Sequence, residues 1–292
     1  MNEPNERTGA AATEPGNAAA TAPASPTVIV ITGASDGIGA EMARQWSAAR
    51  RGGIALVLAA RNVEKLEAVA ASCRANGSQV RVQRCDVAHA ADCRALIGTA
   101  VDTFGRIDTL VNNAGMSAHA NLADVGDLDW YETLMRINHW GSVWCTHAAL
   151  PHLLASRGRI VAVASLAGLV GVPGRTAYSA TKFAMVGFFE SLRTELLEGG
   201  VSVTIAYPGV VATEIRRRGF DASGRAAGRS GLDERDAMPV ETCARLIVEG
   251  TERRRRDIVM SGKGRLGRWL KLVAPGYVDR LALKALNREG GA

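Results

Sequence analysis

A tyrosine and a lysine stand four residues apart in the stretch YSATK, at Tyr178 and Lys182. On a helix, residues at this spacing lie on one face, so the phenol and the ammonium would be neighbours. The flanking residues are small and apolar, and burying a charge there is costly unless the charge has a partner. A neighbouring ammonium would lower the pKa of the phenol from about 10 toward neutrality, which suits a proton-transfer residue. In isolation, a solvated Tyr and Lys on a helix surface explain the pattern better, so it needs support from elsewhere.

The chain that positions this pair alternates between short apolar runs and longer helical stretches from Thr27 onward. The short runs are rich in β-branched residues and are expected to be strands at 27–32, 54–60, 79–85, 107–113, 159–165 and 201–207. Helices are expected from the turn after the first strand to about 51, and at 62–75, 90–104, 127–155 and 176–197. This alternation indicates an α/β fold, a single doubly wound Rossmann-type parallel sheet with helices on both faces. Ligands of such sheets bind beyond the carboxyl ends of the strands.

Three glycines follow the first expected strand in TGASDGIG, at Gly33, Gly37 and Gly39. Glycine allows a sharp strand-to-helix turn and a close approach of the backbone to a pyrophosphate, which the N-terminus of the next helix attracts. A tight turn without a ligand is the alternative, and the spacing is G-x-x-x-G-x-G rather than G-x-G-x-x-G. The turn is therefore a candidate phosphate site only together with other motifs.

Further motifs follow the later strands in a fixed order. They are NNAG at 112–115, Ser165 at the end of the fifth strand, Tyr178 and Lys182 beyond it, and PGVVAT at 208–213. With the glycine spacing, this order resembles the short-chain dehydrogenase/reductase family over about residues 27–258. The resemblance implies a catalytic domain at 27–262, with the catalytic residues Asn138, Ser165, Tyr178 and Lys182.

In that family the tyrosine is the general acid/base, and the lysine lowers its pKa and binds the nicotinamide ribose. Ser165 would donate a hydrogen bond to the substrate carbonyl, although a serine that only caps the turn before Gly168 is the simpler alternative. Asn138 would bend its helix and hold a water that relays protons to the lysine. His139 could serve as a base, but a lone histidine on a core helix is more often structural. We expect His139 and Trp140 to narrow the pocket.

The second expected strand ends in Ala60 and Arg61, where NAD-binding sheets carry an acidic residue for the adenosine ribose. A guanidinium pairs with a 2′-phosphate, so NADP(H) is expected. Asp36 in the glycine turn argues against this and has to point away from that phosphate. Asp86, after the third strand, would meet the adenine amino group. By resemblance the cofactor contacts are Gly33, Ser35, Gly37, Ile38, Gly39, Arg61, Asp86, Val87, Asn112, Ala114, Gly115, Tyr178, Lys182, Pro208, Gly209, Val211 and Thr213.

Composition limits the class of protein. Of the 292 residues 47% are hydrophobic, which is enough for a sizeable core, and 35 Lys and Arg against 29 Asp and Glu give a net charge of +6. Much of this excess lies near the C-terminus, so no nucleic-acid partner is expected. The five cysteines lack C-x-x-C spacing, which favours a reducing compartment and no metal site. Residues 1–26 are expected to be a disordered leader without the apolar region of a signal peptide, and no transmembrane run occurs, so a cytoplasmic protein is expected.

The basic tail at 263–292 carries two apolar stripes with helical spacing. They consist of Leu266, Trp269, Leu270 and Val273, then Val278, Leu281, Ala282 and Ala285. Either two short helices pack on the body or on a second subunit and cover the substrate cleft, or the tail lies weakly on an anionic membrane surface with Trp269 at the interface. By resemblance, a homodimer or homotetramer would form through the helices that carry Asn138 and Tyr178.

The expected activity is the NADP(H)-dependent interconversion of a ketone or aldehyde and an alcohol. Segments 59–67 and 187–196 are most similar to family members that act on lipophilic carbonyls such as steroids, retinoids or long-chain ketones. A 3-oxoacyl-thioester reductase is one alternative. A catalytically silent NADP(H)-binding sensor or interaction protein on the same fold is another. The substrate stays open, because the expected substrate loop at 214–238 offers few apolar anchors.

Overall fold

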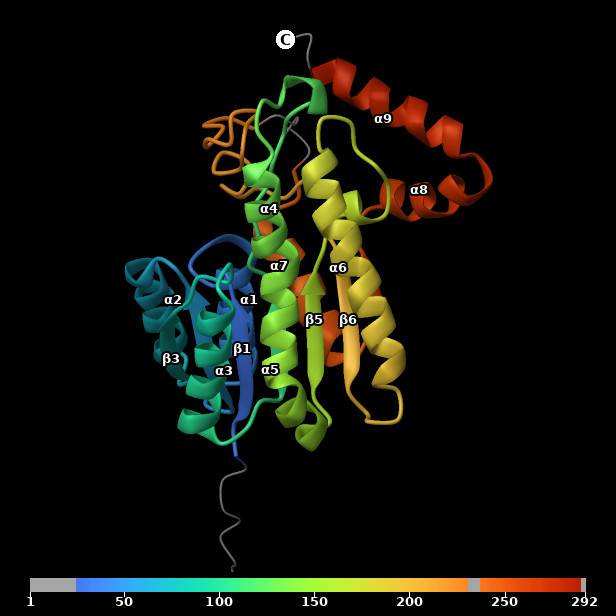
Figure 1. Cartoon of the computed structure of the whole chain (residues 1–292). Helices are drawn as coiled ribbons and strands as arrows, with labels where there is room; N and C mark the ends of the chain where they lie inside the picture. Colours follow the sequence, from blue (N-terminus) through green and yellow to red (C-terminus); the bar gives the residue numbers. More distant parts are fainter. Residues whose placement is uncertain (1–24, 231–236, 290–292) are drawn as a thin grey trace, which may run out of the picture.

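The computed structural model describes residues 25–230 and 237–289 (Figure 1). The leader expected at 1–26 lies almost wholly outside these residues and stays a prediction. The same holds for part of the expected substrate loop, at 231–236.

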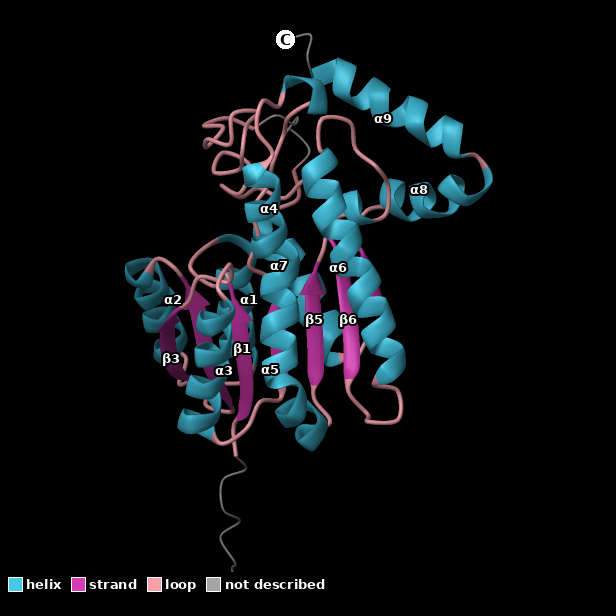
Figure 2. Cartoon of the chain, viewed as in Figure 1, coloured by secondary structure: helices cyan, strands magenta, loops and turns pink. Residues whose placement is uncertain are grey.

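Within the described residues, seven strands form one parallel sheet in the order β3-β2-β1-β4-β5-β6-β7 (Figure 2). Register is continuous across the centre, where Ile31 of β1 lies opposite Leu58 of β2 and Val111 of β4. The strands are β1 (Thr27–Thr32), β2 (Ile54–Ala60), β3 (Gln79–Arg84), β4 (Thr109–Asn112), β5 (Arg159–Val163), β6 (Ser202–Tyr207) and β7 (Asp257–Val259). The predicted doubly wound sheet is confirmed, and it extends by one short strand, β7, that the sequence analysis did not predict.

Helices cover both faces of the sheet because successive strand residues point to opposite faces. In β1, Val30 belongs to the core under α3, α5 and α6, whereas Ile29 and Ile31 belong to the core under α1, α2 and α7. The helices are α1 (Gly37–Ala49), α2 (Val63–Ala75), α3 (Ala90–Phe104), α4 (Asp129–Met135), α5 (Gly141–Ser156), α6 (Thr176–Glu195) and α7 (Val240–Glu252). All five cysteines of these two cores are buried and free. The helix expected at 127–155 is divided by a π-helical turn, Arg136–Trp140, between α4 and α5.

The tail forms the two expected helices, α8 (Gly262–Val273) and α9 (Pro275–Glu289). Ser261 caps α8, since its Oγ accepts a hydrogen bond from Gly264 N at 2.9 Å. Both helices lie beyond the carboxyl ends of the strands, on the β6 side of the molecule (Figure 1). No helix in the described part of the chain is long and apolar enough to cross a membrane.

The apolar stripe of α8 is largely exposed and does not pack on the body, which leaves a second subunit or a membrane surface as its expected partner. Trp269 is 69% exposed and Val273 80% exposed. Two basic residues turn inward instead: Arg268 pairs with Asp257 at 2.9 Å, and Lys271 Nζ donates to Leu169 O at 3.1 Å. The tail therefore anchors itself through cations and leaves apolar side chains at the surface.

Candidate active site

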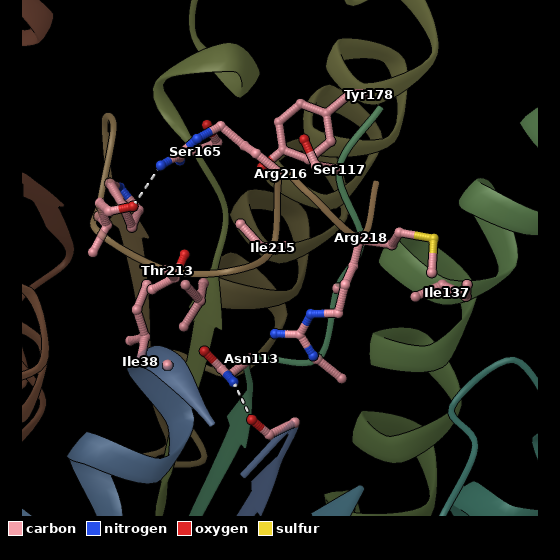
Figure 3. Close-up of a pocket in the computed structure, with 18 of the residues that line it drawn as sticks. Ile38, Asn113, Ser117, Ile137, Ser165, Tyr178, Thr213, Ile215, Arg216 and Arg218 are labelled. Atoms are coloured by element: carbon pink, nitrogen blue, oxygen red, sulfur yellow. Dashed lines mark hydrogen bonds between the residues drawn. The ribbon is translucent and has the colours of Figure 1, made fainter. Parts of the chain in front are cut away.

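A cleft of about 420 Å³ opens beyond the carboxyl ends of β1 to β6 (Figure 3). Its volume is in the range of small-molecule sites, and its place is the one expected for ligands of a parallel sheet. Most of the predicted site residues meet there. Those that line it are Gly33, Ser35, Gly37, Ile38, Arg61, Asp86, Val87, Ala114, Gly115, Ser165, Tyr178, Lys182, Pro208, Gly209, Val211 and Thr213.

Tyr178 and Lys182 lie one turn apart on α6, as the spacing predicted, and both are buried. Lys182 Nζ is 5.8 Å from the centre of the Tyr178 ring and donates a hydrogen bond to Val163 O at 3.0 Å. That carbonyl ends β5, so the sheet itself fixes the ammonium beside the phenol. The buried ammonium thus has both a hydrogen-bond acceptor and a neighbouring group that can become an anion.

The environment of Tyr178 favours the phenolate. Burial alone raises the pKa of the phenol, but the charges of Lys182 and Arg175 and a hydrogen bond to Ser165 outweigh it, so the pKa lies below its usual value. Burial also lowers the pKa of Lys182, and the nearby phenol opposes this change. A phenol with a lowered pKa can exchange its proton more readily near neutral pH.

Ser165 occupies the end of β5, as predicted. Its Oγ accepts a hydrogen bond from Ala167 N at 3.2 Å and so caps the short helix Leu166–Gly168. The structure thus shows the capping contact, in which Oγ is the acceptor and the O–H stays available as a donor, and the nearby hydroxyl helps to lower the pKa of Tyr178. The backbone contact holds the hydroxyl at the phenol.

Asn138 lies in the π-helical turn and is fully buried. Its Oδ1 accepts from Met116 N at 2.7 Å, while its Nδ2 donates to Met116 O at 2.9 Å and to Thr181 Oγ1 at 3.0 Å. Asn138 is not among the described residues that line the cleft. It instead ties the loop after β4 to α6, next to Lys182.

His139 and Trp140 were expected to narrow the pocket, and that expectation is wrong. His139 packs against Trp140 and Phe188, with ring centres 5.5 and 6.1 Å apart, and neither His139 nor Trp140 is among the described cleft residues. Burial lowers the pKa of His139. The alternative of a catalytic histidine at this position is thereby excluded on geometry.

The glycine turn has the shape that a dinucleotide requires. Gly33 has φ +66°, and an added Cβ would lie 2.8 Å from Ala114 Cα. Gly39 does not line the cleft in the described structure; a Cβ there would meet Gly33 O at 2.4 Å, so this glycine lets α1 approach the turn. Asp36 precedes α1 without capping it through its side chain. The N-terminus of α1 therefore faces the cleft as a site for a phosphate group.

Of the two neighbouring asparagines, the predicted one faces away from the cleft. Asn112 Nδ2 donates to Thr146 Oγ1 on α5 at 2.9 Å, and in the described structure this residue does not line the cleft. Asn113 does, and its Nδ2 donates to Thr32 O at 2.9 Å and to Gly33 O at 3.1 Å. Asn112 thus supports the sheet, while Asn113 holds the glycine turn (Figure 3).

The cationic end of the cleft is consistent with a 2′-phosphate. Arg61 lines the cleft directly after β2 and is exposed. Asp36, the residue that argued against NADP(H), forms an ion pair with Arg218 at 2.8 Å and lies 4.0 Å from Lys65. Its negative charge is thereby directed to two cations of the chain.

Several cleft residues were missed by the sequence analysis. The polar and charged ones are Asn113, Ser117, Arg175, Arg216 and Arg218, and the apolar ones include Met116, Val172 and Ile215. Arg175, three residues before Tyr178, could have been found as a basic residue at the start of the catalytic helix. Arg216 and Arg218 come from the irregular segment after β6, whose course the sequence did not predict (Figure 3).

Comparison with known proteins agrees with this geometry. The family model described as short chain dehydrogenase matches residues 27–223. An 11-beta-hydroxysteroid dehydrogenase A of Sesamum indicum is 39% identical over 260 residues, covering 86% of this chain and 73% of that protein. An 11-beta-hydroxysteroid dehydrogenase-like 4A of Arabidopsis thaliana is 36% identical over 252 residues, covering 85% and 81%.

Solved structures also match. A metagenomic short-chain oxidoreductase in complex with NADP superposes with a TM-score of 0.64 at 28% identity, over 80% of this chain and 96% of that one. An alcohol dehydrogenase of Thermococcus sibiricus, complexed with 5-hydroxy-NADP, has a TM-score of 0.68 over 80% and 94%; at 24% identity it supports the fold alone. This chain belongs to the short-chain dehydrogenase family and is an oxidoreductase.

Proposed function

We propose that the protein is an NADP(H)-dependent oxidoreductase that interconverts a lipophilic ketone or aldehyde and the corresponding alcohol, with Tyr178 as general acid/base. The observation that carries this proposal is the buried phenol of Tyr178, whose pKa is lowered and which has Lys182 and Ser165 as neighbours. This arrangement serves proton transfer to or from an oxygen atom.

The chain's residues divide the work as follows. The nicotinamide cofactor, when bound, supplies or accepts the hydride. In the reducing direction the Tyr178 hydroxyl donates its proton to the carbonyl oxygen, and the Ser165 hydroxyl donates a hydrogen bond to the same oxygen. The Lys182 ammonium stabilises the phenolate that remains, and it would also hold the nicotinamide ribose. In the oxidising direction the phenolate takes the proton of the alcohol.

NADP(H) is favoured over NAD(H) by the charges at the end of β2. Arg61 would pair with the 2′-phosphate, and Ala60 supplies no carboxylate for a free ribose hydroxyl. The Asp36 carboxylate also lines the cleft, and its ion pairs with Arg218 and Lys65 would reduce its repulsion of the phosphate. The NADP complex of the metagenomic short-chain oxidoreductase supports the same cofactor.

The substrate is proposed to be lipophilic. Met116, Leu166, Val172 and Ile215 give the catalytic end of the cleft an apolar lining, and Tyr178 joins a buried cluster with Trp130. Several relatives are named as 11-beta-hydroxysteroid dehydrogenases, which supports a bulky apolar carbonyl or alcohol for this chain.

A panel of ketones, aldehydes, 3-oxoacyl thioesters and secondary alcohols, with NADPH oxidation or NADP reduction as the readout, tests this function. We expect turnover of bulky apolar carbonyls and little turnover of thioesters. Preferred turnover of 3-oxoacyl thioesters would identify the reductase alternative instead. Tight NADPH binding with no turnover across the panel would leave a silent sensor.

The tail is proposed to lie on an anionic membrane surface close to the protein's apolar substrate supply. The apolar side chains exposed on α8 and α9 include aromatic residues that favour the interface, and cations surround them. The apolar ones are Leu266, Trp269, Leu272, Val273, Tyr277, Leu281 and Leu283. Trp269 and Leu272 are 69% and 72% exposed, and Arg265 on the same helix is exposed as well.

Co-sedimentation with vesicles that contain anionic lipid tests the tail proposal on the full chain at low salt. The Trp269→Ser/Leu272→Ser variant should lose binding. Leu197→Ser is the matched control, because Leu197 is 71% exposed at the end of α6 opposite the cleft and should not matter. Wild-type protein that stays in the supernatant would rule the membrane out.

A homo-oligomer is proposed to form through α5 and α6. Trp140, the last residue of the π-helical turn, is followed on one side of α5 by Trp144 and Leu154, and Trp140 and Leu154 are 45% and 40% exposed. Trp140 stacks on Trp144 with ring centres 5.9 Å apart. Light scattering should show a dimer or tetramer that Trp140→Glu dissociates and that Val63→Glu, at an exposed position of α2, does not; a monomeric wild type would refute this interface.

A further inference from the structure

Arg175 directly precedes α6 and stands three residues before Tyr178. Only 9% of the residue is exposed, and its guanidinium carbon lies 4.1 Å from the centre of the Tyr178 ring. A cation over the face of an aromatic ring is attracted by it, and the attraction is stronger where water is excluded. Arg175 is thus a buried charge placed against the flat side of the proposed catalytic phenol.

The position of this guanidinium is fixed from the opposite side of the cleft. Its Nη2 donates to Ser117 Oγ at 2.6 Å and its Nε donates to Ala118 O at 3.3 Å, both in the loop after β4. A backbone hydrogen bond joins the same two segments, since Ala120 N donates to Gly174 O at 2.8 Å. The planar, forked donor set of arginine suits such a joint between two segments.

The charges that act on Tyr178 in the described structure come from three elements. Lys182 lies on the same helix, Arg175 lies in the turn before it, and Arg216 lies in the segment after β6. Arg216 is held by Val211 O at 2.8 Å and by Ser230 Oγ at 3.1 Å. All three are cations, so each favours the phenolate over the phenol.

Arg175 differs from Lys182 in one respect that matters for catalysis. Burial lowers the pKa of Lys182, and the charge of Arg175 lowers it further. A guanidinium, in contrast, stays protonated under all ordinary conditions. The field of Arg175 on the phenol is therefore constant with pH.

We propose that Arg175 is a positioning residue for the proton transfer: stacked on Tyr178, it holds the ring at the cleft and shares with Lys182 the stabilisation of the phenolate. The proposal rests on the proposed function in that Tyr178 is taken as the acid/base. It adds a second cation beside Lys182 to a site whose chemistry the tyrosine, lysine and serine would otherwise carry alone.

Ultraviolet titration of the phenolate in the absence of substrate tests this proposal. Tyr178→Phe serves as the reference that removes the contribution of the other three tyrosines. We expect Arg175→Met, which keeps much of the volume but no charge, to raise the apparent pKa of Tyr178 by about one unit. Arg175→Lys should raise it less, because the charge remains while the planar stack is lost.

A purely structural role for Arg175 would lower the melting temperature and leave the titration unchanged. An apparent pKa in Arg175→Met that equals the wild-type value overturns the proposal. If Arg175→Met does not fold, Arg175→Lys and Ser117→Ala decide: both loosen the stack, and an unshifted titration in both overturns the proposal equally.

The titration needs no turnover, so its result is independent of the carbonyl panel. Absence of turnover would refute the proposed function, while the titration would still show whether Arg175 lowers the pKa of Tyr178. Where an alcohol is oxidised, the pH profile of kcat should shift upward by the same amount in Arg175→Met, with KM for NADP unchanged.

Discussion

The catalytic cleft and the C-terminal tail place charge and apolar surface in opposite ways. In the cleft, Tyr178, Lys182 and Arg175 are buried, at 8%, 3% and 9% exposure. In α8, by contrast, Leu272 and Val273 are 72% and 80% exposed, while the tail's Arg268 and Lys271 turn toward the body. Charged side chains are usually exposed and large apolar ones usually buried. The cleft buries charged side chains and the tail exposes apolar ones, so the two regions depart from this distribution in opposite ways.

The difference separates two kinds of functional surface. A buried cation is costly unless it is hydrogen-bonded, and Lys182 and Arg175 both bond to backbone carbonyls. The cleft therefore bears that cost around the phenol of Tyr178, where the proposed proton transfer would need an electrostatic field. Exposed apolar side chains cost little by themselves, but gathered on one pair of helices they indicate contact with another surface.

The largest effect is expected from the cleft. Tyr178→Phe should lower kcat by about a hundredfold or more, because only the phenolic oxygen carries the proton. NADPH binding, followed by fluorescence, should stay within about twofold of wild type because the ring is retained. Turnover near the wild-type rate would show that the buried phenol is not the acid/base.

Two glycine-to-alanine substitutions test whether the backbone is packed more tightly at the cleft than in the tail. Gly39→Ala should destabilise the protein by about 1–3 kcal/mol, because the new methyl group would meet Gly33 O and a backbone oxygen cannot step aside. Gly267→Ala in α8 is the matched change: the described structure places nothing within 4 Å of that Cβ, so the better helix former should stabilise by up to about 1 kcal/mol. Urea denaturation measures the change in the free energy of unfolding for both variants. A change of the same sign in both would contradict the difference in packing between the two regions.

Two arginine substitutions, one in each region, test which cation binds the cofactor's 2′-phosphate. Arg61→Ala should weaken NADPH binding about tenfold and upward and leave NADH binding nearly unchanged, because a charge-assisted contact to the 2′-phosphate is worth roughly 1.5–3 kcal/mol. Arg265→Ala in the tail should not change the Kd of either cofactor. Equal Kd values of wild-type protein for NADPH and NADH would remove the case for Arg61.

The smallest effect is expected for stability in the tail. Trp269→Ser should change the free energy of unfolding by no more than about 0.5 kcal/mol, since the side chain makes few contacts that folding creates. Phe189→Ala, which empties a fully buried position in the core under α6, should cost about 3–5 kcal/mol. A large loss from Trp269→Ser in a monomeric sample would mean that α8 is part of the folded core.

The central sheet could be predicted because its strands are continuous apolar runs. Six strands were expected, and each lies within the expected range give or take one or two residues. β7 was missed because it has only three residues, of which Ile258 alone is buried. Its helix α7 escaped prediction as well, although it brings Cys243, Ala244 and Ile247 into the core.

The order of the motifs predicted which segments form the cleft, but it did not predict which side chains of those segments face it. Successive residues of an extended segment point to opposite sides, and the sequence did not reveal that Asn113 rather than Asn112 faces the cleft. In the tail, the spacing predicted an apolar stripe correctly. Which side faces the body was decided by Asp257, in the short strand before α8, and by the carbonyl of Leu169, which is distant in sequence from α8.

The π-helical turn at Arg136–Trp140 also has a consequence for how this chain tolerates length changes. Each residue of a regular helix advances the side-chain direction by about 100°, so a turn with one extra residue sets α4 and α5 out of rotational phase. The side chains of α4 are directed to pack on α6, while those of α5, rotated about the helix axis relative to α4, are directed to pack on α3. Deleting one residue from this turn would bring the two helices into a common phase and rotate one of their packed faces away. A substitution at the exposed Arg136 of this turn is therefore expected to be tolerated far better than a single-residue deletion.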